Sequence, residues 1–81
     1  MLVRSHHTSQ ARKMASYYVN TNAQDNGDHE VHREGCRVMP ALANRLYLGD
    51  FAGCHAAVGA AKQHYRQSNG CIHCSPDCHT S

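Results

Sequence analysis

The stretch of residues 15–34, ASYYVNTNAQDNGDHEVHRE, decides the fold expected for this chain. Its first seven residues are rich in aromatic and β-branched side chains and predict a strand. Asn26 and Gly27 favour a tight turn, because both residues tolerate the positive φ angles of hairpins. Residues 29–34 alternate in polarity and predict the returning strand, with Val31 facing the core.

The rest of the chain predicts a further strand and a helix. Residues 35–44 predict a loop and residues 45–48 a third strand, which a glycine then breaks. Asp50 is a candidate N-cap for a helix from residue 51 to about residue 66, which an Asn-Gly pair would end. The inner face of this helix should consist of apolar side chains at helical spacing: Phe51, Cys54, Val58, Ala61 and Tyr65.

This order of elements predicts an α+β domain over residues 15–81. We expect a small three-stranded antiparallel sheet with one helix packed on one face, followed by a Cys-rich C-terminal segment. Residues 1–14 are polar and lack periodicity, which predicts a disordered tail. Met14 directly precedes the first strand, so a natural start at Met14 is a further hypothesis.

The expected core is small for a self-supporting domain. Chains below about 70–80 residues rarely gain more than ~3–5 kcal/mol from packing, and they often add a metal ion, disulfides or a partner subunit. This chain has 81 residues and few large aliphatic side chains. A cross-link is therefore expected on physical grounds, before any motif is considered.

Charge and hydropathy exclude several classes of function. Residues 15–81 carry five basic and six acidic side chains, so the net charge of +2 comes from the first fourteen residues. Nucleic-acid binding needs a clustered basic surface, and none is visible. No apolar run is long enough to span a membrane, and the N-terminus lacks the apolar region of a secretory signal. We therefore expect no nucleic-acid or membrane partner and a cytoplasmic location.

The C-terminal segment contains the candidate chemistry of the chain. It reads CIHCSPDCH over residues 71–79, and the spacing of Cys71 and Cys74 suits one tetrahedral zinc ion with sulfur–metal distances of about 2.3 Å. A second turn would bring Cys78 to the same ion. The candidates for a fourth ligand are His79, His73, Cys54 and Cys36. Cys36 and Cys54 are favoured, because adjacent residues such as Cys78 and His79 rarely bind one ion together.

Two other states of the cysteines remain open. Disulfides could form between Cys71 and Cys78 or between Cys36 and the C-terminal segment, and because five is an odd number at least one cysteine would stay unpaired. Alternatively, all five are free thiols. A redox-active Cys71–Cys74 pair would need its first cysteine at the N-terminus of a helix, which lowers the thiol pKa, and here the helix precedes the motif.

The segment from His29 to His32 resembles a zinc-protease motif only superficially. That motif needs two histidines four residues apart on a helix. Here they are three apart on an expected strand, where their rings point to opposite faces. We expect one solvated and one partly buried histidine, either of which could still supply a ligand to a remote site.

Several segments together resemble a family of short, uncharacterised bacterial proteins. They are YYVNTNAQ, NGDHEVH, YLGDF, CHAAV and the C-terminal NGC–C–CHTS, and the likeness covers roughly residues 15–81. The hairpin followed by this helix is also similar to small bacterial ββα domains. The resemblance implies a fold but no activity, because the family is a domain of unknown function.

The function expected is that of a small non-enzymatic binding or interaction module. An unknown protein would be its partner, and zinc held by Cys71, Cys74, Cys78 and one further ligand would stabilise it. The alternatives are a thiol-dependent redox or metal-transfer protein that uses Cys71 and Cys74, and a disulfide-stapled structural domain. No catalytic residue is assigned.

Overall fold

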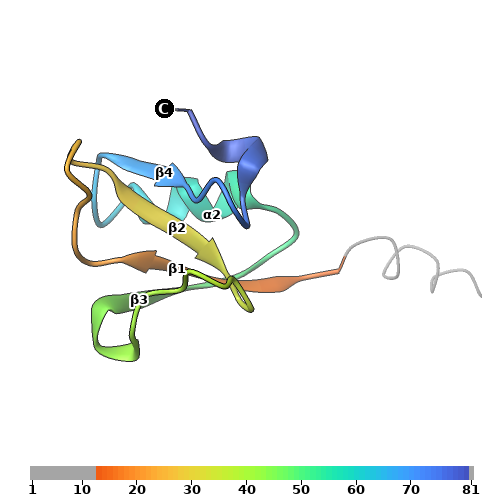
Figure 1. Cartoon of the computed structure of the whole chain (residues 1–81). Coiled ribbons are helices and arrows are strands. Elements are labelled where there is room, and N and C mark those ends of the chain that lie inside the picture. Colours follow the sequence, from red (N-terminus) through yellow and green to blue (C-terminus); the bar gives the residue numbers. More distant parts are fainter. Residues whose placement is uncertain (1–12, 81) are drawn as a thin grey trace, which may run out of the picture.

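The computed structural model describes residues 13–80 of the chain. Within them, four strands, one α-helix and two short 3₁₀ segments follow one another (Figure 1). Their order is β1 (Ala15–Asn20), β2 (His29–Arg33), η1 (Leu42–Asn44), β3 (Arg45–Phe51), α2 (Cys54–Ala61), β4 (Ser68–Gly70) and η2 (Pro76–Cys78). The predicted disordered tail, residues 1–14, lies almost entirely outside the described residues and stays a prediction.

The strands form a mixed sheet in the order β3-β1-β2-β4. β1 pairs antiparallel with β2 and with β3, whereas β4 pairs parallel with β2. The α+β class is confirmed, but the prediction of a three-stranded antiparallel sheet is wrong. The fourth strand, Ser-Asn-Gly, is short and polar, and it is extended because it pairs with β2 rather than through its own β propensity.

The β1–β2 hairpin has the predicted position. Val19 pairs with Val31, and both side chains are fully buried. Gly27 has a φ of 93°, in the left-handed region that its sequence position predicted. The hairpin loop also contacts the segment directly before β4, since Gln67 Nε2 donates a hydrogen bond to the carbonyl oxygen of Asn26 at 3.0 Å.

Strand β3 is longer than predicted, and this moves the start of the helix. The glycine expected to break the strand, Gly49, lies inside it with a φ of 130°, next to an irregularity in the β1–β3 register. Asp50 is consequently a strand residue, and its carboxylate accepts hydrogen bonds from Ser16 Oγ and Tyr47 Oη at 2.6 and 2.7 Å. The predicted N-cap role of Asp50 is therefore wrong, and Gly53 takes that position.

Helix α2 lies across one face of the sheet and contacts all four strands (Figure 1). It ends at Ala61, earlier than predicted, because residues 62–67 carry the chain back to the free edge of β2. The buried core is made mostly of small side chains: Tyr17, Val19, Val31, Cys54, Ala57, Ala61 and Cys78. Such an interior is thin, as the composition predicted.

A disulfide between Cys54 and Cys78 joins the start of α2 to the C-terminal segment. The two cysteines are 24 residues apart in the sequence. Closing a loop of this length restricts the unfolded chain and stabilises the fold by about 3 kcal/mol. In the described part of the chain, no helix has the length and apolar character needed to cross a bilayer.

Candidate metal centre

The pairing of β2 with β4 brings the first two residues of the candidate site together. Val31 is opposite Gly70 in the parallel register, and the backbone N–H of Cys71 donates to the Val31 carbonyl oxygen at 3.0 Å. His32 follows Val31 in β2, and Cys71 follows Gly70 at the end of β4. The side chains of His32 and Cys71 therefore leave the sheet on the same face. Val31 points into the core, and His32 therefore lies on the face of the sheet opposite α2.

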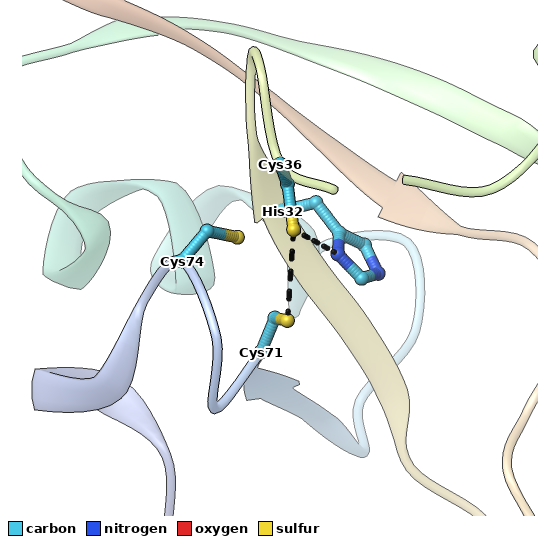
Figure 2. Close-up of side chains that lie close together, drawn as sticks. All are labelled: His32, Cys36, Cys71 and Cys74. Carbon is cyan, nitrogen blue, oxygen red and sulfur yellow. Dashed lines mark hydrogen bonds between the residues drawn. The ribbon is translucent and has the colours of Figure 1, made fainter. Parts of the chain in front are cut away.

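A tight turn at the end of β2 adds Cys36. The Cys36 N–H donates to the carbonyl oxygen of Arg33 at 3.0 Å, and Gly35 within this turn has a φ of 91°. Glycine adopts that conformation without the steric cost that other residues meet. The turn folds the chain back so that Cys36 Sγ lies 3.6 Å from His32 Nδ1 (Figure 2).

The Cys71–Cys74 segment adds the fourth side chain through a second turn. The Ser75 N–H donates to the Cys71 carbonyl oxygen at 2.8 Å, which closes the turn. Backbone N–H groups are directed at both sulfurs: His73 donates to Cys71 Sγ at 3.4 Å, and Arg33 donates to Cys74 Sγ at 3.2 Å. Such bonds stabilise negative charge on sulfur and fix the orientation of a metal ligand.

The four side chains have the dimensions of a zinc site. One ligand atom from each of His32, Cys36, Cys71 and Cys74 lies within 4.8 Å of the other three (Figure 2). Around a tetrahedral zinc ion, two sulfurs lie about 3.8 Å apart, and a sulfur and an imidazole nitrogen lie about 3.6 Å apart. The Cys36–Cys71 sulfur distance is 3.9 Å and the Cys36–His32 distance is 3.6 Å, so both match the edges of that tetrahedron.

Burial keeps the Cys36 and Cys71 thiols of the cluster protonated as long as no cation is bound. Burial, with a contribution from Cys74, raises the pKa of Cys36 to about 12, and burial also raises the pKa of Cys71. Close, partly desolvated thiols cannot all ionise unless a positive charge compensates them. Burial lowers the pKa of His32, so the imidazole is neutral near pH 7, as metal binding requires.

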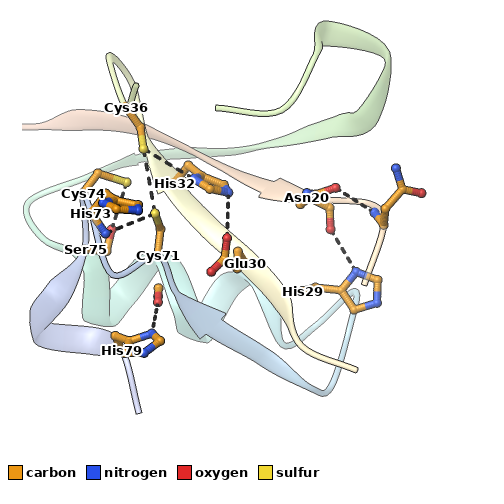
Figure 3. A network of polar contacts seen from close by, with 12 residues as sticks. Asn20, His29, Glu30, His32, Cys36, Cys71, His73, Cys74, Ser75 and His79 are labelled. Carbon is orange, nitrogen blue, oxygen red and sulfur yellow. Dashed lines mark hydrogen bonds and ion pairs between the residues drawn. The ribbon is translucent and has the colours of Figure 1, made fainter. Parts of the chain in front are cut away.

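A carboxylate lies behind the histidine of the site. Glu30 Oε1 is 3.7 Å from His32 Nε2, the ring nitrogen on the side away from Cys36 (Figure 3). Metal-binding histidines commonly have a carboxylate or carbonyl at the second ring nitrogen, where it fixes the tautomer and raises the basicity of the ligand. The structure therefore places a partner of this type next to His32, at a distance at which the interaction is electrostatic rather than a hydrogen bond.

The structure divides the predicted ligands into two groups. It brings Cys36, Cys71 and Cys74 together, but it pairs Cys54 with Cys78 in a disulfide. His79 lies elsewhere, with Nδ1 3.1 Å from the carbonyl oxygen of Gly70. His73 points at Arg37, whose Nη2 is 3.2 Å from His73 Nδ1.

Sequence reasoning did not single out His32 as the fourth ligand. The sequence signal that could have identified His32 is its position next to Val31 in a strand. Because Val31 faces the core, His32 faces the other side of the sheet, where it contacts residues distant in the sequence only if another segment covers that side. Its ring is almost fully buried, with 1% of its surface exposed. The free thiols are Cys36, Cys71 and Cys74, and they are the three cysteines of this cluster.

Comparison of the chain with known protein families, with curated proteins and with solved structures finds no match. The chemistry of the site therefore rests on its geometry. With four protein ligands, a tetrahedral site has no open position for a substrate or an activated water. An ion held by all four side chains would therefore have a closed coordination shell.

Proposed function

We propose that this chain is a small non-enzymatic interaction module whose fold is stabilised by zinc held by His32, Cys36, Cys71 and Cys74. The observation that carries the proposal is the clustering of their ligand atoms within 4.8 Å of one another. We infer zinc rather than another metal because three thiolates and one imidazole form one of the common ligand sets of structural zinc sites.

The position of the site supports a stabilising role. His32 and Cys36 come from β2 and the turn after it, whereas Cys71 and Cys74 follow β4. An ion bound to all four would fasten the short fourth strand to the sheet. Binding free energy at such a site contributes directly to folding, because the unfolded chain has no preformed site.

A redox role for the Cys71–Cys74 pair has less support. Reactive cysteines are found where the thiolate is stabilised, typically at a helix N-terminus. Cys71 instead follows strand β4, and its pKa is raised by burial. A thiol held in the protonated form is a poor nucleophile until a metal ion displaces the proton.

A cluster of two tyrosines and an arginine on β1 and β3 supports a role in binding another protein. The rings of Tyr18 and Tyr47 lie 5.5 Å apart, and the Arg45 guanidinium lies 5.1 Å from the centre of the Tyr18 ring. Tyr47 is 54% exposed. Tyrosine and arginine are enriched in protein–protein interfaces, where they supply much of the binding energy.

Native mass spectrometry of the purified chain tests the metal assignment. We expect one zinc ion per chain, its loss on chelation, and unfolding that follows that loss. Cobalt substitution should give the intense visible absorption of a tetrahedral thiolate site. A double variant, Cys54→Ser with Cys78→Ser, serves as the control and should retain one zinc ion. Retention of zinc by Cys36→Ser and Cys71→Ser variants would contradict the proposed ligand set.

A further inference from the structure

The Cys54–Cys78 disulfide borders a cavity whose lining contains none of the four proposed metal ligands. The cavity has a volume of about 350 Å³ and lies between α2, β4 and the C-terminal segment. Its lining includes polar and charged side chains and one of the two disulfide cysteines: His55, Lys62, Asp77, Cys78 and Thr80. A small molecule in this cavity would therefore be in contact with Cys78.

The other end of the disulfide lies where negative charge is stabilised. Cys54 is the first residue of α2, and the N-cap position before it is Gly53, which has no side chain to bind the free N–H groups of the first turn. A ring nitrogen of His55 lies within 4.8 Å of both disulfide sulfurs. The helix N-terminus and a nearby histidine both favour a thiolate at Cys54.

We propose that Cys54–Cys78 is a redox-active disulfide that small thiols reduce through this cavity. The thiolate of the reductant attacks Cys78 Sγ, and a new sulfur–sulfur bond forms as the Cys54–Cys78 bond breaks. The electron pair of the broken bond leaves on Cys54 Sγ, at the N-terminus of α2. A second reductant thiolate then attacks its own sulfur in the mixed disulfide and releases Cys78 as a thiolate. Two reductant molecules are oxidised to one disulfide, and the protein gains two electrons.

The charges of the cavity select the class of thiol. Lys62 can bind a carboxylate and Asp77 can bind an ammonium group, and both line the cavity with Cys78. A thiol with the zwitterionic group of an amino acid meets both requirements. The cavity volume is at the lower end of the range for small-molecule sites, which suits a ligand of this size.

The rate of disulfide reduction in the zinc-loaded chain tests this proposal. L-cysteine and 2-mercaptoethanol are compared at equal thiolate concentration, and the products are trapped by alkylation and assigned by peptide mass. We expect faster reduction by L-cysteine. Lys62→Gln and Asp77→Asn should each slow the reaction with L-cysteine about threefold and leave the reaction with 2-mercaptoethanol unchanged, because each removes one exposed charge contact. His55→Gln should slow both reactions.

A trapping experiment identifies the attacked sulfur. When the wild-type chain reacts with a limiting amount of L-cysteine and is quenched with acid, the mixed disulfide should be found on Cys78, and peptide mass identifies its position. A mixed disulfide on Cys54, or equal amounts on the two cysteines, would overturn the direction of attack. If L-cysteine and 2-mercaptoethanol reduced the disulfide at equal rates in the wild-type chain and in the charge variants, the proposed thiol-binding site in the cavity would be overturned. Reduction that proceeds only as fast as global unfolding would overturn it as well.

Discussion

The ring of His32 and the thiol of Cys71 meet because β4 joins β2 in parallel register, with Gly70 opposite Val31. Without β4, the β1–β2 hairpin would not bring any cysteine of the C-terminal segment next to His32. The cluster of His32, Cys36, Cys71 and Cys74 and the fourth strand thus depend on one another. Four predictions test this relationship and the packing around it.

Replacing Cys74 with serine should lower the free energy of unfolding by several kcal/mol in zinc-containing buffer, because one thiolate ligand is lost. In excess chelator the difference from wild type should shrink to about 1 kcal/mol, since only local packing then differs. Denaturant titrations in both buffers measure this. Ile72→Ser is the matched control: Ile72 lies between the ligands but is 54% exposed, and its replacement should change stability by about 0.5 kcal/mol or less. Equal losses with and without chelator would exclude a metal-based effect.

Replacing Glu30 with glutamine should weaken zinc binding about tenfold, because the carboxylate near His32 Nε2 no longer increases the basicity of the ring. Competition with a chromophoric chelator measures the affinity. Glu34→Gln is the control, since the Glu34 carboxylate accepts a hydrogen bond from Tyr18 Oη and does not contact His32. If both variants bound zinc with the same affinity as wild type, Glu30 would have no role in tuning the ligand.

The metal-free chain should lose stability as the pH falls through 6.5, the ordinary pKa of histidine. Burial holds the pKa of folded His32 below that value, so the unfolded state binds more protons than the folded state in this window and acid favours unfolding. Melting temperatures from about pH 8 to about pH 5 should show this slope. His32→Gln should flatten it. An unchanged slope in that variant would assign the acid sensitivity to another group.

Replacing Gly70 with alanine should destabilise the chain by about 1–3 kcal/mol through overpacking. A Cβ atom at Gly70 would lie 2.7 Å from Cys78 Cβ and 2.8 Å from the Ser75 carbonyl oxygen. Gly59→Ala is the control: Gly59 is in α2, a Cβ there meets nothing within 4 Å, and alanine should stabilise the helix by about 0.5–1 kcal/mol. Thermal unfolding of both variants measures the contrast, and a neutral Gly70→Ala would show that β4 and the C-terminal segment separate easily.

Local patterns predicted the elements that depend on neighbouring residues. The β1–β2 hairpin follows from the alternation of side chains around Asn26 and Gly27. The proximity of the Cys71 and Cys74 thiols follows from their spacing in the sequence. The fourth strand was missed because Asn69 and Gly70 resemble a helix stop, and only the free edge of β2 makes them extended. The same non-local pairing explains why His32 was not selected as a ligand and why the partner of Cys78 was not found.

The origin of the ligands also determines when this domain can be completed during synthesis. His32 and Cys36 leave the ribosome long before Cys71 and Cys74, so a nascent chain ending before residue 71 has only half of the proposed ligands. Until then one edge of β2 stays unpaired and open to other chains. A nascent chain that has reached only residue 70 therefore has an incomplete set of cysteine partners, because Cys36 and Cys54 are made before the cysteines that they meet in the folded chain.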